Sequence, residues 1–540
     1  MLNSRTFALT NKLLLHFQMK FYKRVFLSLL FFLTLLTIGI LTWYYLQGPA
    51  HQGLVRSDFA DRPFKIEEIV DITPVADKPN IVFILADDLG YGDVGYNMQT
   101  SINTQHLDKL ASESVVFTNF YAPSSICTPS RFGFLSGRYA IRQGLAYPFH
   151  HVNTSLVMNI GSRVANVLGA VDMRGEHNII NGIMQSEITI PELLKLADYK
   201  TGVVGKWHLG TISQDDQFHP FNHGFDYFVG LEASNDDWPV AFYDNDEKVL
   251  DDIGLDQEHY TQLFTDAAKS FISENQNEPF FLYLAHKDPH QPFFPSKGFK
   301  GKSKAGAYGD AVEEFDHSVG EILAYLDSLN LTENTIVVVT SDNGPWFEGN
   351  SCGLRGRKGQ VFEGGYRVPF MMRYPRKIKS AYKTDAPAMG IDLLPTLVAE
   401  AGVSLPKDRK IDGINLFELL ADTTNFVSTR PLFFFHDYAF EAVRMGDWKF
   451  IETNYSYTWP IPLEHPNYAT KGFVPTYTPP EKDTTINRLD NWPKLFNLKT
   501  SPYESYNLHT RHKAKSQEMQ RVLSAFKKDF LDNPRGWVDR

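Results

Sequence analysis

The chain has only two cysteines in 540 residues, Cys127 and Cys352. Two cysteines cannot form a disulfide framework, so they do not indicate a redox compartment. The sequence also lacks an excess of basic charge, because 53 Lys and Arg stand against 63 Asp and Glu, a net charge of −10. This balance argues against binding through a basic surface, and we expect no nucleic acid as a partner. Internal repeats are absent as well.

The longest uncharged apolar run lies near the N-terminus, directly after a basic flank at Lys20–Arg24. Its length of roughly 20 residues is that of a membrane-spanning helix, and the basic side is expected to stay cytoplasmic. Trp43, Tyr44 and Tyr45 close the run as an interfacial belt, and it has no polar stripe of the kind found on a core helix. A signal peptide starting at Met19 is the alternative, although the run has no clean cleavage site. We therefore expect an exported protein, membrane-anchored or periplasmic/extracytoplasmic (secretory pathway in a eukaryote), with residues 1–24 cytoplasmic, 25–46 a transmembrane signal anchor or uncleaved signal, and 47–78 a polar linker.

From Asn80 onward, short apolar runs alternate with helical patterns, which is typical of an α/β fold with a mainly parallel sheet. After about residue 430 the pattern changes to short strands, which predict a smaller antiparallel region. We expect a catalytic domain at 79–428 and a C-terminal subdomain at 429–540. A Pro- and Tyr-rich stretch at 454–480 is interpreted as a surface loop, with a substrate-contacting rim as the alternative. The apolar runs are 81–85, 201–205, 280–285 and 335–339, and the helical patterns are 104–114, 190–197, 310–329 and 391–401.

Polar side chains follow each of the four apolar runs. Ligands of open α/β sheets bind outside the carboxyl ends of the strands, so these groups are expected to converge at one edge. Each residue alone has an ordinary interpretation, such as a helix cap or a solvated loop charge. Together the oxygen donors suit Ca²⁺ or Mg²⁺ rather than zinc, and the added cations suit an anion such as sulfate or phosphate. The residues are Asp87 and Asp88, Lys206 and His208, His290, Asp342 and Asn343, with Arg131 and Lys358 as further cations.

The stretch "SSICTPSR" at 124–131 surrounds the first cysteine. Thr128 is predicted to cap a helix that has Pro129 at its first position. Cys127 would then lie just before a helix N-terminus, whose partial positive charge favours an anion, and Arg131 could turn back toward the same pocket. The alternative is a buried structural cysteine.

The run "ICTPSRFGFLSGR" at 126–138 resembles the signature of the type I, formylglycine-dependent sulfatase family. Five further motifs match that family in order, and similarity covers about residues 78–425. The text "QFHPFNHGFDYFVG" is most similar to the arylsulfatase A and N-acetylgalactosamine-6-sulfatase branch. The resemblance implies an alkaline-phosphatase-like fold, with a large mixed, mainly parallel sheet flanked by helices and a smaller C-terminal antiparallel subdomain. The five motifs are "ILADDLGYGD", "GKWHLG", "DPHQP", "TSDNGP" and "LRGRKGQVFEGGYRVP".

By this resemblance, a formylglycine-generating or sulfatase-maturating enzyme converts Cys127 to Cα-formylglycine (3-oxoalanine), reading Pro129 and Arg131. The hydrated aldehyde would be held on one divalent ion, Ca²⁺ or alternatively Mg²⁺, and would attack sulfur. One histidine would protonate the leaving alcohol, while His208 would support the formylglycine hydroxyl; His286 matches no family position. The implied metal ligands are Asp87, Asp88, Cys127, Asp342 and Asn343, and the implied catalytic residues are Cys127, Arg131, Lys206, His208, His290 and Lys358.

The sequence thus predicts a sulfuric ester hydrolase acting on a sulfated sugar or polysaccharide, or on another sulfate ester. A phosphoester or phosphonate hydrolase of the same superfamily, and a catalytically inactive carbohydrate-binding relative, are the two alternatives. Arg357 precedes Lys358 in "LRGRKGQVFEGG" and is expected to have no catalytic role.

Overall fold

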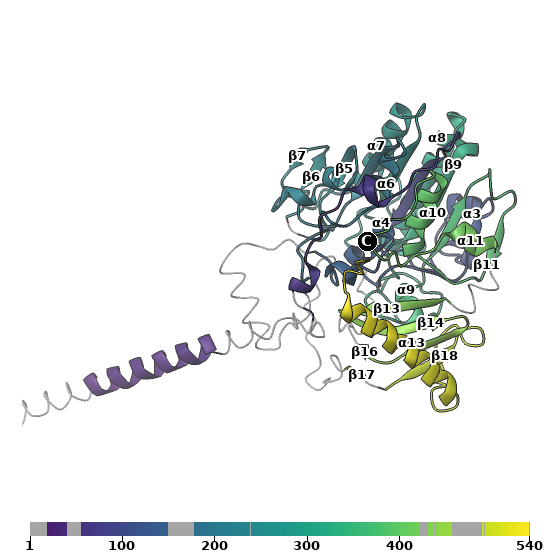
Figure 1. Ribbon diagram of the computed structural model, residues 1–540. Coiled ribbons are helices and arrows are strands. Elements are labelled where there is room, and N and C mark those ends of the chain that lie inside the picture. Colours follow the sequence, from purple (N-terminus) through teal and green to yellow (C-terminus); the bar gives the residue numbers. More distant parts are fainter. Residues whose placement is uncertain are drawn as a thin grey trace, which may run out of the picture. The chain divides into compact units, whose positions relative to one another are not determined.

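A ten-stranded sheet forms the centre of the protein (Figure 1). The computed structural model describes residues 19–39, 54, 56–149, 178–237, 239–421, 430–436, 438–455, 489–490 and 492–538. Five neighbouring strands run parallel, and the strands at both edges include antiparallel pairs. The predicted mixed, mainly parallel α/β fold is confirmed. In spatial order the strands are β11 (Tyr382–Thr384), β2 (Val115–Phe117), β10 (Phe370–Arg373), β9 (Thr335–Ser341), β1 (Asn80–Ala86), β8 (Phe280–Ala285), β4 (Lys200–Lys206), β5 (Tyr227–Leu231), β6 (Phe242–Asp244) and β7 (Glu247–Leu250).

Both faces of this sheet are covered by helices. Alternate residues of a strand point to opposite faces, so Phe83 of β1 packs in one apolar cluster and Val82 in the other. This double burial explains why the central strands are continuous apolar runs rather than alternating ones. The cluster around Val82 includes side chains of α3 (Gln105–Ala111), α7 (Tyr260–Glu274) and α8 (Gly306–Ser328), and the cluster around Phe83 includes those of α4 (Cys127–Ser136), α6 (Ile190–Lys195) and α10 (Leu393–Glu400).

A second, four-stranded antiparallel sheet follows, as predicted. One long helix, which the sequence analysis did not predict, packs against it, and the Phe433 and Phe526 rings stack at 3.7 Å between centroids. Within the stretch 454–480, only residues 454 and 455 lie among the described residues. The strands are β13 (Pro431–His436), β14 (Ala439–Met445), β15 (Trp448–Ile451) and β18 (Lys494–Asn497), and the helix is α13 (Lys513–Asp532); shorter elements are α2 (Ile66–Ile69), β3 (Phe120–Tyr121), α9 (Glu363–Tyr366), β12 (Ala388–Met389), α11 (Leu416–Ala421), β16 (Asn454–Tyr455) and β17 (Leu489–Asp490).

The N-terminal region differs in part from the expectation. A helix at Met19–Gly39 is long and apolar enough to cross a membrane, and the proposed aromatic belt at 43–45 lies outside the described residues. The expected polar linker at 47–78 is wrong in part, because Phe59 and Ile69 within it are buried in the apolar core. Charged residues precede both side chains in the sequence, so composition alone gave no sign of their burial.

A buried ion network joins the second sheet to α9 and β3. The ammonium of Lys449 on β15 lies 2.9 Å from Glu363 Oε1 and 3.2 Å from Glu504 Oε1, and all three side chains are fully buried. The Tyr121 hydroxyl donates to Glu363 Oε2 at 2.7 Å. Glu363 is the first residue of α9, which follows the loop that carries Lys358. The C-terminal sheet therefore holds one end of that loop.

Replacing Lys449 should destabilise the whole fold. Lys449→Ala leaves two buried carboxylates without their cation, which typically costs about 3–5 kcal/mol. We expect a loss of that size in the free energy of unfolding measured with urea. Lys407→Ala is the matched control, because Lys407 forms an exposed pair with Asp71 at 2.5 Å and should cost no more than about 1 kcal/mol. Equal effects of the two variants would contradict the proposed role of the network.

Candidate active site

The four strands that precede the predicted polar residues are direct neighbours, in the order β9, β1, β8, β4. Ala86 at the end of β1 pairs with Ser341 of β9, and Ala285 of β8 pairs with Gly205 of β4. The chain leaves all four strands at the same edge, so the residues that follow lie together. This is the carboxyl edge where open α/β sheets bind ligands.

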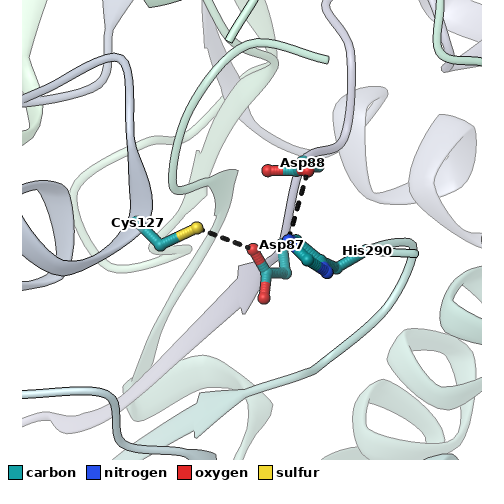
Figure 2. A group of neighbouring side chains, drawn as sticks. All are labelled: Asp87, Asp88, Cys127 and His290. Atoms are coloured by element: carbon teal, nitrogen blue, oxygen red, sulfur yellow. Dashed lines mark hydrogen bonds and ion pairs between the residues drawn. The ribbon is translucent and has the colours of Figure 1, made fainter. Parts of the chain in front are cut away.

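Cys127 approaches this edge from the start of α4. Figure 2 shows its thiol donating to Asp87 Oδ1, with Sγ and Oδ1 3.4 Å apart. The predicted capping by Thr128 is wrong, because α4 begins at Cys127 itself and Ile126 is the N-cap. The Thr128 hydroxyl instead donates to the carbonyl oxygen of His208 at 3.0 Å, since tertiary contacts outcompete the local cap.

The predicted oxygen ligands form one buried group. Asp88 accepts a hydrogen bond from the Asn343 amide at 2.6 Å, and its backbone N–H donates to Asp342 Oδ1 at 3.2 Å. Asn343 Oδ1 is buried and has no hydrogen-bond partner. A buried amide oxygen in this state is suited to coordinate a cation. Ligand atoms of Asp87, Asp88, Cys127 and His290 lie within 4.8 Å of one another (Figure 2), although His290 was not predicted as a ligand.

Each carboxylate of this group is paired with a cationic side chain. Lys206 Nζ lies 2.5 Å from Asp87 Oδ2, and Lys358 Nζ lies 2.7 Å from Asp88 Oδ1. Arg131 Nη2 lies 3.0 Å from Asp342 Oδ2 and 3.4 Å from Asp87 Oδ2. Three carboxylates and three cations leave this group with little net formal charge.

Burial and the ion pairs together determine the protonation states of Asp87, Asp342 and Cys127. Burial would raise the pKa of Asp87, but Lys206, His290 and Arg131 hold that pKa well below its usual value. Burial and the neighbouring charge of Asp87 raise the pKa of Asp342 to about 7, although Arg131 opposes them. Burial and Asp87 also raise the pKa of the Cys127 thiol well above its usual value. The thiol is therefore protonated at neutral pH, and a simple thiolate nucleophile is disfavoured.

The two predicted histidines, His290 and His208, make different contacts. His290 Nδ1 donates to the Gln291 carbonyl oxygen, which directs Nε2 toward Asp88 Oδ2 at 3.7 Å. His208 Nε2 donates to the Phe149 carbonyl oxygen at 2.7 Å, and the His208 carbonyl oxygen accepts from Thr128. His286 belongs to the apolar core, where burial lowers its pKa to about 4, in agreement with its omission from the predicted site.

Asp88 and His208 both have left-handed backbone conformations, with φ of 67° and 55°. Such conformations cost about 1–3 kcal/mol for residues other than glycine and concentrate at functional sites. Each of these residues comes within two positions of a strand end, where the chain must turn sharply to bring the side chain into the pocket.

The backbone segments before and after Lys358 pack closely against each other. A Cβ on Gly364 would lie 2.2 Å from the Gly356 carbonyl oxygen, so this glycine serves loop packing rather than the approach of a ligand. Arg357 donates to the carbonyl oxygens of Trp346 and Gly349 at 2.7 and 2.9 Å. Arg357 is thus a structural clamp on the preceding loop segment.

The turn at Ser234–Asp237, which follows β5, contributes to the site but was not predicted from the sequence. Ser234 Oγ accepts a hydrogen bond from Lys206 at 3.0 Å, and Asp236 Oδ1 lies 4.0 Å from His290 Nδ1. Asp237 Oδ2 lies 4.0 Å from His208 Nε2. The sequence carries a weaker signal here, because the acidic pair Asp236 and Asp237 is separated from the apolar run "YFVGL" by Glu232–Asn235.

Comparison with known proteins agrees with this geometry. A family model described as "Sulfatase" matches residues 79–403, which is more than half of the chain. The chain belongs to the sulfatase family. A second model, described as the C-terminal part of N-sulphoglucosamine sulphohydrolase, matches residues 357–457 of this sulfatase.

Individual relatives cover most of the sulfatase. Mouse N-acetylgalactosamine-6-sulfatase is 34% identical over 474 residues, 83% of this chain and 84% of the relative. Human steryl-sulfatase is 33% identical, over 68% of this chain and 74% of the relative. A solved structure described under the metabolism of multiple glycosaminoglycans by Bacteroides thetaiotaomicron is 29% identical, with a TM-score of 0.67, over 84% of this chain and all of that one. The curated relatives are sulfuric ester hydrolases, and so is this chain.

Calcium should stabilise the sulfatase against unfolding, because a cation would relieve the repulsion among the buried carboxylates. A ligand that binds only the folded state stabilises it by about 2.7 kcal/mol at a hundredfold excess over its Kd. We expect Ca²⁺ to raise the thermal midpoint of the chelator-treated protein, as measured by calorimetry. Asp342→Ala should lose most of this shift, whereas Asp266→Ala, exposed on α7, should keep it. An unchanged shift in Asp342→Ala would exclude Asp342 as a ligand.

Proposed function

We propose that this sulfatase hydrolyses sulfate esters of a carbohydrate at the pocket around Cys127. The observation that carries the proposal is the contact of Cys127 with Asp87, which belongs to a group of three carboxylates that are each paired with a cation. The names of its relatives support a sulfated sugar or polysaccharide, since they include an N-acetylgalactosamine-6-sulfatase.

The state of Cys127 supports conversion to formylglycine. A fully buried thiol with a raised pKa is a poor nucleophile at neutral pH, although it occupies the centre of the site. The Cys-Thr-Pro-Ser-Arg run is the family's modification signal, and we propose a formylglycine-generating or sulfatase-maturating enzyme as a partner. Because Cys127 is only 2% exposed, this partner would have to act before folding is complete.

The donor set fits a hard divalent cation, with Ca²⁺ as the proposal and Mg²⁺ as the alternative. Asp87, Asp88, Asp342 and Asn343 would hold it together with residue 127. When bound, the ion supplies Lewis-acid stabilisation of anionic oxygens, and formylglycine supplies an oxygen nucleophile.

The cationic side chains and the two histidines are assigned different roles in the reaction. Lys206 and Lys358 lie against Asp87 and Asp88, where they can also donate to sulfate oxygens and balance the charge that grows on them. Arg131 is committed to Asp342, Asp87 and the Lys206 carbonyl oxygen, so it holds the acidic group in place. His290, with Nδ1 occupied by a carbonyl, can offer only Nε2 to the ester, and we assign it the proton for the leaving alcohol. His208 would support residue 127 through the start of α4.

The helix at Met19–Gly39 supports export of the catalytic domain, either as a membrane anchor or as a signal segment. Its basic flank favours a cytoplasmic N-terminus. The domain boundaries at 78 and 428 remain part of this proposal.

Mass spectrometry of the peptide containing residue 127 tests the modification. Active enzyme should carry formylglycine at this position, and Cys127→Ala should abolish release of sulfate while leaving the thermal midpoint within a few degrees. Cys352→Ala is the matched control, since Cys352 is the other cysteine and lies partly exposed in a loop. Active protein with only unmodified Cys127 would refute the assignment. Faster hydrolysis of a phosphate analogue than of its sulfate ester would favour the phosphoester alternative.

Lys358 should matter for the rate more than for the fold. Removing a charged donor from such a site costs roughly 3–4 kcal/mol, or about 10²–10³ in kcat. We expect that loss in Lys358→Ala, measured by steady-state release of sulfate from an ester. Lys407→Ala is the matched control, because Lys407 forms an exposed pair with Asp71 outside the site and its loss should leave kcat nearly unchanged. Arg357→Ala is unsuitable as a control because Arg357 clamps the same loop. A Lys358→Ala variant with wild-type kcat would exclude the assignment.

A further inference from the structure

Asp236 is the most exposed charged group of the site. Its side chain is 42% exposed, compared with 12% for Lys358, 8% for His290 and 2% for Asp88. It is therefore the charged group of the site that is most accessible to the solvent-exposed part of a bound substrate.

The imidazole of His290 stands between two carboxylates. Its Nε2 faces Asp88 Oδ2 at 3.7 Å, and its Nδ1 lies 4.0 Å from Asp236 Oδ1. Nδ1 already donates to the Gln291 carbonyl oxygen, so Asp236 is not required to orient the ring. The two oxygens of a carboxylate can accept about four hydrogen bonds, which leaves acceptor capacity at Asp236 for a ligand.

The chemistry of Asp236 excludes sulfate as its ligand. A sulfate ester has no proton to donate, and its charge would be repelled by a carboxylate. A cationic group on the substrate is also disfavoured, because the charges of His290, Lys206 and Lys358 all act at this carboxylate. A neutral hydroxyl group is the donor that suits both conditions.

We propose that Asp236 binds a hydroxyl group of the alcohol portion of the substrate, close to the sulfate ester. This inference rests on the proposed function, because it assumes that the ester is cleaved beside His290. It makes Asp236 a specificity-determining residue, which favours sulfated polyhydroxy compounds over aryl sulfates that lack such a hydroxyl.

Three substrates test the inference with the full-length enzyme: N-acetylgalactosamine 6-sulfate, its 4-deoxy analogue, and 4-nitrophenyl sulfate. A hydrogen bond to a charged group corresponds to roughly 10- to 100-fold in kcat/KM. The wild-type enzyme should prefer the hydroxylated sugar over the deoxy sugar by that factor. Asp236→Ala should abolish this preference, because the ratio of kcat/KM between the two sugars is measured within one variant and does not change with a general effect on His290. Asp236→Asn, which keeps one acceptor oxygen, should retain part of the preference.

Asp244→Asn removes one exposed carboxylate from β6, outside the site, and should leave all three values unchanged. A preference that survives in Asp236→Ala would overturn the inference, as would an equal loss on all three substrates, which would indicate a structural role. Hydrolysis of 4-nitrophenyl sulfate alone would also overturn it. A wild-type enzyme that releases sulfate from none of the three would instead count against the proposed function.

Discussion

The arrangement of the site depends on the burial of opposite charges at one edge of a parallel sheet. Asp87, Asp88 and Asp342 are removed from water, which is costly for any carboxylate without a partner. An oxygen of each carboxylate lies within 3.0 Å of a nitrogen of a cationic side chain, and the three cations come from different segments of the chain. The cations come from α4, β4 and the loop before α9, so the charge pairs also hold these segments together.

This constraint explains why segments outside the central sheet are tied so firmly to it. The loop that carries Lys358 is held by Arg357 on one side and leads into Glu363 on the other. Glu363 in turn pairs with Lys449 from the C-terminal sheet, beside the buried Glu504. The smaller sheet thus contributes no charged group to the pocket among the residues described above, yet it fixes the position of one that does.

The site is also asymmetric in charge. Its buried end combines acidic metal ligands with cations, which suits an anion bound together with a divalent ion. Its exposed end carries Asp236, on a turn that also holds Lys206 through Ser234. A sulfate group and a hydroxylated alcohol would therefore meet different chemistry at the two ends, with His290 between them.

The sequence alone determined the central strands and most of the candidate site, because both leave local signals. Strands buried on both faces are continuous apolar runs, and the polar residues directly after them, such as Asp87 and Asp342, stand out by contrast. It did not determine contacts between segments far apart in the chain. The hydroxyl of Thr128 had a plausible local role as a cap, but tertiary structure gave it the carbonyl of His208. Phe59 gave no sign of burial, and Arg357 gave no sign of clamping a loop. Asp236 carried a signal that only its distance from His290 made meaningful. Apart from the local contacts of Arg357, these features rest on pairings of groups tens to hundreds of residues apart, and only the folded chain decides which groups meet.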